Sequence, residues 1–120
     1  MEIEKLSWSQ SYSLTAALSS APAYSGVYLF AAVTRFAGLE IGTVPLYIGK
    51  AANLRRRFAQ HYARQRDVAW RKTIHADQVL VVRWSRVPRE QISPVEIFLI
   101  RKLSPQFNQV NYTTDRADAA

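Results

Sequence analysis

Two runs of β-forming residues, each bounded by a glycine, constrain the fold of this 120-residue chain more than any other feature. The first run, GVYLFAAV, starts at Gly26, and the second, VPLYIG, ends at Gly49. Both are rich in residues that pleated strands favour, and the segment RFAGLEIGT between them, residues 35–43, is typical of a turn. The two runs therefore predict a long antiparallel hairpin.

Successive side chains of a strand point to opposite faces, so the hairpin predicts which residues lie together. In the first strand, Tyr28 lies opposite the aliphatic residues, which are Val27, Leu29, Ala31 and Val33. In the second strand, Leu46 and Ile48 share a face and Tyr47 points away from them. If the aliphatic faces pack on one core, both tyrosines are expected at the opposite surface.

The remaining elements follow from spacing and from helix-breaking residues. A short helix is predicted from Ser13 to Ser20, and a second from Leu54 to about Gln65. The run QVLVVRW, Gln78 to Trp84, predicts a third strand buried on both faces, and a final helix runs from Ser93 to Leu103. The order β-β-α-β-α indicates an α+β layer fold with a three-stranded, mainly antiparallel sheet.

The second predicted helix carries both apolar and chemically active residues. Asn53 is suited to cap it, and Leu54, Phe58 and Tyr62 are spaced to form an apolar edge. Arg57 and His61 are four residues apart, so they lie on a common face of this helix.

Composition excludes several classes of site. The length fits one domain, and no apolar run is long enough to span a bilayer, so we expect a cytoplasmic protein. There is no cysteine and there are only two histidines, so any metal is expected to be held by oxygen. The net charge of +7 favours a polyanionic partner, nucleic acid before a membrane surface.

Several motifs together resemble the GIY-YIG nuclease family, from roughly Pro22 to Asn108. They are GVY at 26–28, YIG at 47–49, Lys50, Arg57 eight residues past the second glycine, and EIFLIRKLSPQFN from Glu96 to Asn108. We expect an N-terminal extension with a short helix (1–21), a nuclease domain that contains these motifs (22–112) and, from its polar and alanine-rich composition, a tail without fixed structure (113–120).

The resemblance implies hydrolysis of phosphodiester bonds with one divalent ion, Mg²⁺ or Mn²⁺, bound by Glu96. The other implied site residues are Tyr28 and Tyr47 as site tyrosines, Lys50, Arg57 as the phosphate-binding cation, His61, which matches a histidine of some members, and Asn108 as an orienting amide. The segment between the two tyrosines is longer than is usual in the family, and residues 36–42 are expected to form an inserted loop at the hairpin tip.

Phosphodiester chemistry fits these residue types independently of the family. Hydrolysis builds negative charge on phosphate oxygens, which a hard cation and a guanidinium can stabilise together. A base must also activate water, and a free phenol with a pKa of about 10 is rarely ionised at neutral pH. Lys50, Arg57 and the metal are expected to lower a tyrosine pKa, and the base is left open among Tyr28, Tyr47 and His61.

Purely structural interpretations exist for some of these residues. Glu96 follows Ser93 by three positions, so the pair could form a capping box at a helix start. Asn108 could be a turn residue after Pro105. Trp70, like Trp8 and Trp84, is expected to be structural.

The expected substrate is DNA, branched or otherwise structured, held through its backbone by Lys50, Arg55, Arg56 and Arg64. A chain of this size has little surface for base recognition, so a homodimer, a partner protein or the shape of the DNA is the expected source of specificity. Two other functions remain: a non-cleaving nucleic-acid-binding module, or a subunit that needs a partner.

Overall fold

The structure, a computed structural model, describes residues 5–108. Its elements in chain order are α1 (Leu14–Ser20), β1 (Gly26–Phe36), β2 (Leu39–Ala51), α2 (Leu54–Ala63), α3 (Arg66–Arg71), β3 (Gln78–Arg86), the 3₁₀ turn η2 (Arg89–Gln91) and α4 (Ile92–Leu103). The strands form one antiparallel sheet in the order β2-β1-β3. The predicted α+β class and three-stranded antiparallel sheet are therefore confirmed. The tail at 113–120 lies outside the described residues.

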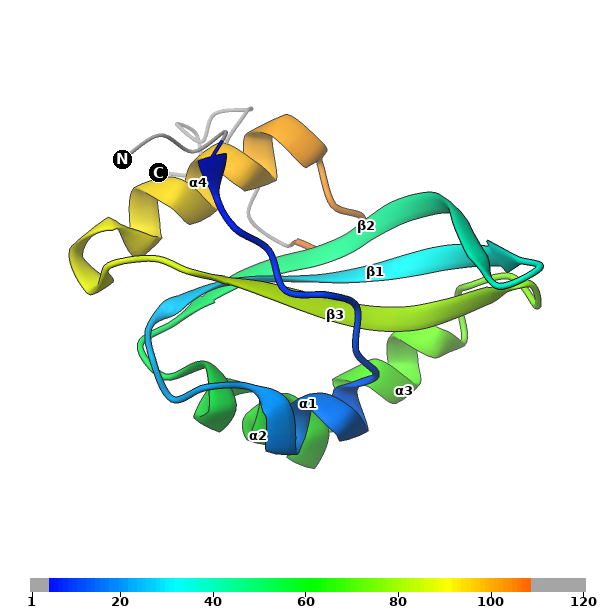
Figure 1. Ribbon diagram of the computed structural model, residues 1–120, viewed down its shortest axis with the longest axis horizontal. Coiled ribbons are helices and arrows are strands. Elements are labelled where there is room, and N and C mark those ends of the chain that lie inside the picture. Colours follow the sequence, from blue (N-terminus) through cyan, green and yellow to red (C-terminus); the bar gives the residue numbers. More distant parts are fainter. Residues whose placement is uncertain (1–4, 109–120) are drawn as a thin grey trace.

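The sheet is the middle of three layers, so both of its faces are covered except towards the hairpin tip. Helices α1, α2 and α3 cover one face, and α4 lies across the other (Figure 1). Tyr28 and Phe30 pack in the core on the α1–α3 side, whereas Val27 and Ile48 pack beneath α4. The predicted alternation in β1 is confirmed, but the expected exposure of Tyr28 is wrong, because the face opposite the aliphatic residues is covered by helices.

A β-bulge in β2 changes the side of the sheet on which its side chains lie. Phe30 pairs with Tyr47, and the next residue of β1, Ala31, pairs with Pro45, so Leu46 is an extra residue. Leu46 joins the core on the α1–α3 side and Ile48 joins the core beneath α4. The prediction that Leu46 and Ile48 share a face is wrong, because a bulge places two consecutive side chains on one side of a strand.

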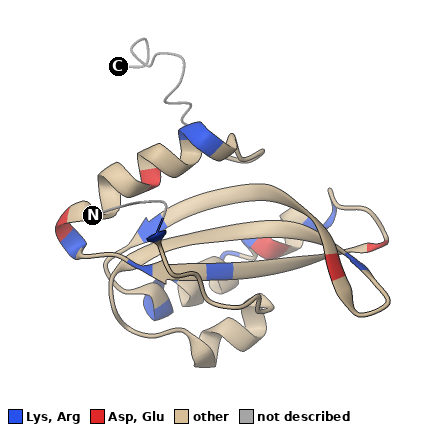
Figure 2. Ribbon diagram, turned by 45° about the horizontal axis from the view of Figure 1, so that its top comes forward, with Lys and Arg blue, Asp and Glu red and all other residues tan. Residues whose placement is uncertain are grey.

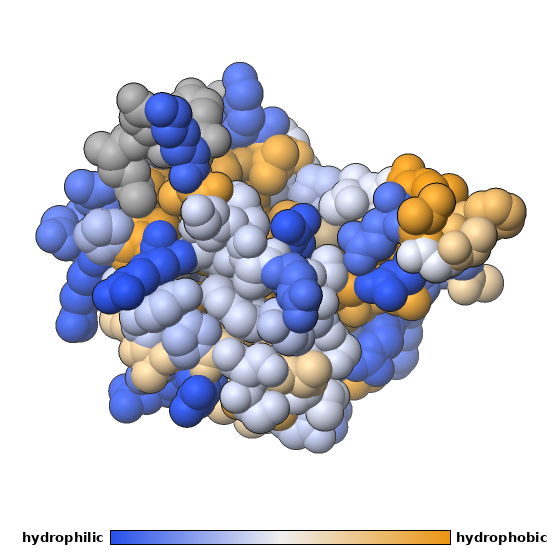
Figure 3. Space-filling view, viewed as in Figure 1, coloured by the Kyte–Doolittle hydropathy of each residue, from blue (hydrophilic) through white to orange (hydrophobic). Residues whose placement is uncertain are grey.

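The hairpin is longer and more regular than predicted. Pairing continues to Phe36 and Leu39, so the expected loop at 36–42 is mostly strand. The turn itself is Ala37-Gly38, with φ of 54° and 82°, as two-residue hairpin turns of the primed types require. The tip exposes large apolar side chains, seen at the right-hand end of the molecule in Figure 3.

Side-chain caps define the starts of the first two helices; the cap at Asn53 is confirmed, and Ser13, predicted as the first residue of α1, is its cap. Ser13 Oγ accepts a hydrogen bond from Ala16 N in α1, and Asn53 Oδ1 accepts one from Arg56 N in α2. Helix α2 ends at Ala63, and the chain then forms α3, which the sequence patterns do not predict. Tyr62 is 51% exposed, so its predicted place on an apolar edge is wrong.

The third strand occupies an edge of the sheet. It extends two residues beyond the predicted end, and its burial is partial, because Val81 and Val82 are buried while Val79 is exposed. The N-terminal segment runs beside it through bridges at Trp8 and Tyr12. None of the helices described in residues 5–108 has the length and apolar character to cross a bilayer.

Candidate active site

The two motif glycines are required by close packing. A Cβ atom at Gly49 would lie 2.3 Å from both Cζ and Oη of the Tyr28 ring. A Cβ atom at Gly26 would lie 2.3 Å from the backbone oxygen of Ser85 on β3. Gly49 therefore makes room for Tyr28. This contact joins the YIG and GVY segments into one structural unit.

Tyr28 and His61 form a buried hydrogen-bonded pair. The phenol oxygen lies 2.7 Å from His61 Nε2, and both side chains are almost completely buried. Burial raises the pKa of Tyr28 well above its ordinary value; Tyr47 adds to this, and Arg57 opposes it. The predicted lowering by Arg57 is present, but burial is the larger effect.

His61 is held in its neutral form. Burial, followed by the positive charges of Arg66, Arg57 and Arg64, lowers its pKa to about 4. A neutral imidazole has one donor and one acceptor nitrogen, so the direction of the bond to Tyr28 depends on the tautomer. The other ring nitrogen, Nδ1, is buried and has no hydrogen-bond partner among residues 5–108.

Tyr47 lies beside this pair but nearer the surface. Its ring centroid is 6.2 Å from that of Tyr28 and 5.8 Å from that of His61, and its side chain is half-buried. Trp70 of α3 stacks on it at 5.3 Å. Trp70 thus fixes a candidate site tyrosine, which the sequence did not indicate because α3 was not predicted.

The available signal for α3 was a pair of charges. Asp67 and Arg71 are four residues apart and form an ion pair along the helix, the spacing that places charges on one helical face. Asp67 is buried, and the pair helps to order the short helix that carries Trp70.

Glu96 of α4 faces Lys50 at the end of β2. Lys50 Nζ donates to Ser93 Oγ at 2.8 Å and lies 3.9 Å from Glu96 Oε1. The Glu96 side chain is only 12% exposed. Burial raises its pKa, and Lys50 and Arg57 oppose that rise. The capping-box alternative is wrong, because α4 begins at Ile92 and the Ser93 hydroxyl accepts from Lys50.

Arg57 links the two halves of the site electrostatically. It lowers the pKa of Tyr28 and of His61 on one side and of Glu96 on the other. It is exposed, and no hydrogen bond or ion pair fixes its guanidinium among residues 5–108. Together with Arg56 it lines a hollow of about 200 Å³ between the end of β2 and the start of α2.

Asn108 clamps the backbone of β2. Its Oδ1 accepts from Ile48 N at 2.9 Å, and its Nδ2 donates to Ile48 O at 2.8 Å. Ile48 lies between Tyr47 and Gly49, so this amide fixes the YIG segment rather than pointing into the site as a free group.

The cations predicted to bind nucleic acid differ in their surroundings. Arg55 Nε donates to the backbone oxygen of Ala21 at 2.8 Å, so it ties α2 to the end of α1. Arg56 and Arg64 are exposed on α2 and at its C-terminal cap, and Lys50 is held by Ser93. Lys and Arg residues are spread over several elements and do not form a single stripe (Figure 2).

Comparison with solved structures places this arrangement in a known fold. The chain is similar to the GIY-YIG N-terminal endonuclease domain of UvrC from Thermotoga maritima bound to magnesium, with TM-score 0.50 and 24% identity over 79% of this chain and 94% of that one. The protein has the GIY-YIG fold. An asparagine point mutant of the same UvrC domain gives TM-score 0.52 and 22% identity, over 81% of this chain and 96% of that one.

The resemblance seen in the motifs is thereby confirmed at the level of the GIY-YIG fold. A tyrosine point mutant of the UvrC domain, with its catalytic divalent cation, matches at TM-score 0.50 and 23% identity, over 79% of this chain and 94% of that one. No family model and no curated protein matches the chain.

Proposed function

We propose that the protein is a metal-dependent endonuclease that hydrolyses phosphodiester bonds in DNA. One observation carries the proposal: Arg57, an exposed cation without a fixed partner in the described chain, acts electrostatically on Tyr28, His61 and Glu96 at once. These side chains come from three elements, β1, α2 and α4. A guanidinium between phenols and a carboxylate suits a phosphate that reacts beside a cation.

Glu96 is the residue that would hold the cation. No three His, Cys, Asp or Glu side chains cluster in residues 5–108, so a caged transition-metal site has no support there. Mg²⁺ needs no such cage, because it keeps several waters and binds through one or two carboxylates and the substrate phosphate. A partly buried carboxylate that still reaches the surface fits Mg²⁺ or Mn²⁺. When bound, the ion would supply positive charge against the phosphate oxygens.

Lys50 and Arg57 have different roles in this proposal. Lys50 is tied to Ser93 and faces Glu96, so it holds the carboxylate in its ionised, metal-binding form. Arg57 is free to form two parallel hydrogen bonds to the scissile phosphate and to stabilise the charge that develops on it.

Tyr47 is our candidate for the base. The hydroxyl of Tyr28 is buried and already bonded to His61, so it has no access to a water molecule at the phosphate. Tyr47 is half-buried, and Trp70 holds its ring in place. The Tyr28–His61 pair then positions Tyr47, because their rings pack against it.

A cleavage screen tests the proposal. Purified protein is incubated with Mg²⁺, Mn²⁺ or EDTA and with duplex, flap, junction and single-stranded DNA, and with RNA. We expect metal-dependent cleavage of at least one DNA, lost by at least 100-fold in Glu96→Gln, which keeps the size of the side chain. Glu40→Gln, which removes an exposed carboxylate at the far end of the hairpin, is the matched control.

Other results of this screen would point elsewhere. Cleavage that survives Glu96→Gln unchanged would reject the metal role of Glu96. Binding without cleavage of any substrate would favour a non-cleaving binding module. Cleavage that requires a second protein would favour a partner-dependent subunit; a homodimer stays a prediction that sedimentation can check.

A further inference from the structure

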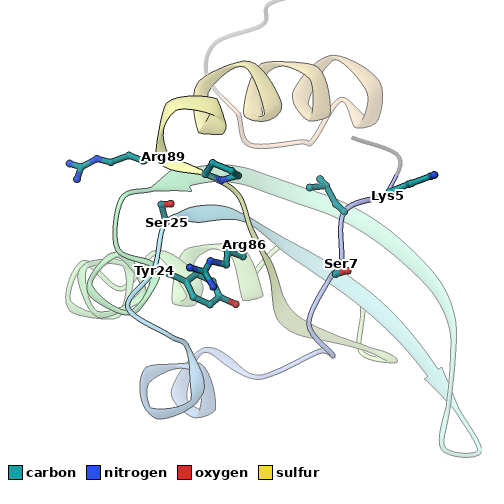
Figure 4. A pocket seen from close by; sticks show the side chains of 8 residues that line it. Lys5, Ser7, Tyr24, Ser25, Arg86 and Arg89 are labelled. Carbon is teal, nitrogen blue, oxygen red and sulfur yellow. The ribbon is translucent and has the colours of Figure 1, made fainter. Parts of the chain in front are cut away.

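A second basic hollow lies at the same end of the sheet as the candidate active site, but at the opposite edge. It is a pocket of about 680 Å³ between the N-terminal segment, the start of β1 and the end of β3 (Figure 4). Lys5, Arg86 and Arg89 contribute positive charge to its lining, Ser7 and Ser25 contribute hydroxyl groups, and among residues 5–108 no acidic residue lines it. Its charge and polar groups suit an anion.

Arg86 is presented in a way that suits a phosphate. Its guanidinium carbon lies 4.7 Å from the centroid of the Tyr24 ring, so the planar head is supported on an aromatic face. Stacking of this kind leaves the N–H groups at the edge of the guanidinium available for a bidentate bond. Neither Arg86 nor Arg89 has an ion-pair partner within residues 5–108, and the Arg89 side chain extends outward, away from Arg86 (Figure 4).

The same stacking argues for a phosphate rather than a base. Among the described residues that line the pocket, Tyr24 is the only aromatic one, and Arg86 covers one face of its ring. A nucleobase would have to displace Arg86 to stack there, whereas a phosphate binds without moving it.

Sheet geometry relates this pocket to the candidate active site. Gly26 of β1 pairs with Ala51 of β2 on one side and with Arg86 of β3 on the other. Two interstrand spacings separate these neighbours, or about 10 Å. Along the axis of a duplex a strand rises by about 3.4 Å per nucleotide, so about three nucleotides cover this distance when the duplex axis runs across the end of the sheet.

We infer that the Arg86–Arg89 pocket binds a backbone phosphate of the nucleic acid whose scissile phosphate lies at Arg57, about three nucleotides away along one strand. This inference rests on the proposed function for the identity of the ligand. It gives the protein a second electrostatic anchor, which sets the direction in which the strand crosses the end of the sheet.

The test is binding of a fluorescent oligonucleotide duplex, measured by anisotropy in EDTA so that cleavage does not enter. We expect R86Q/R89Q to weaken binding about tenfold near 0.15 M salt and to reduce the slope of log K against log salt by about 0.9 for each lost phosphate contact. R86Q is also measured alone, and Arg35→Gln, which removes one charge at the far end of the hairpin, is its control.

A scan with single neutral methylphosphonate linkages identifies the phosphate. At one position, within about two to four nucleotides of the cleaved or most protected linkage, the modification is expected to weaken wild-type binding but to have no further effect on Arg86→Gln. Additive effects at every position would overturn the inference, as would an unchanged salt slope in R86Q/R89Q. Capture of free nucleoside monophosphate that depends on Arg86, with an unchanged oligonucleotide slope, would also overturn it and assign the pocket to a small ligand.

The outcome is separable from that of the cleavage screen. Suppose that no substrate is cleaved, but that one methylphosphonate linkage weakens binding of the wild type and not of Arg86→Gln. This result would reject the nuclease and keep the second anchor. Cleavage of DNA without any linkage whose effect on binding depends on Arg86 would keep the nuclease and reject the anchor.

Discussion

The close contact between Gly49 and Tyr28 makes Gly49→Ala the sharpest test of the site. The added Cβ would lie 2.3 Å from Tyr28 Cζ and Oη, whereas ordinary contact begins near 3.4 Å. The ring would therefore have to move by about 1.1 Å. It has no room to do so, because Phe30, Phe58 and His61 pack against it.

Two costs follow from this movement. Overpacking of a well-packed core costs about 1–3 kcal/mol, and loss of the buried hydrogen bond between Tyr28 and His61 costs about 1–3 kcal/mol more. The two costs sum to about 2–6 kcal/mol, and a loss of 3 kcal/mol would lower Tm by roughly 10–15 °C in a domain of this size, which would still be folded at 25 °C. Displacement of the site by about 1 Å is expected to reduce cleavage by about 100-fold.

Thermal unfolding and cleavage rates measure these effects, with Gly42→Ala as the control in the same strand. At Gly42 the nearest atoms to a Cβ are 3.8 Å away, on Thr34, so the change is expected to stay within about 0.5 kcal/mol. In a Tyr28→Leu background, Gly49→Ala should cost less than about 1 kcal/mol, because the ring it meets is gone. The reasoning would be refuted if Gly49→Ala lowered Tm by less than 3 °C, or if it lowered stability equally in the wild type and in Tyr28→Leu.

Three further predictions concern other parts of the chain. Asn108→Ala should lower stability by about 1–2 kcal/mol in urea titrations, because it leaves both backbone groups of Ile48 without their partner; an unchanged midpoint would contradict the clamp. The pKa of His61 is lowered to about 4 in the folded protein, whereas it is about 6.5 in the unfolded chain. As the pH falls, His61 is therefore protonated in the unfolded chain first, and about 3 kcal/mol of stability present above pH 6.5 is lost by pH 4. Urea titrations across this range should show that loss in the wild type and a smaller one in His61→Gln. Ala37→Asn should raise Tm by a few degrees, since Asn tolerates the positive φ of the turn better than Ala does; a lower Tm would argue against that backbone.

The sequence alone determined the elements whose signals are local. The β-formers around Tyr28 and Tyr47 specified the hairpin, and Asn53 marked a helix start through a side-chain cap that needs no distant partner. The motif residues, read together, also indicated the GIY-YIG fold.

The tertiary structure decided what each face of those elements meets. Alternation placed Tyr28 opposite Val27, but only the packing of α1–α3 buried Tyr28 and gave its hydroxyl to His61. The bulge at Leu46 depends on the pairing of β2 with β1, which a one-strand pattern does not contain.

Local patterns likewise left the partners of the site residues undecided. The S-P-V-E spacing fitted a cap, and the choice against it was made by Lys50, which is distant in sequence and binds Ser93. Trp70 and Asn108 acquired their roles in the same way, by contact with Tyr47 and with Ile48. Backbone preference and side-chain period act over a few residues, so they define the elements, whereas burial and hydrogen-bond partners are fixed only when distant segments pack together.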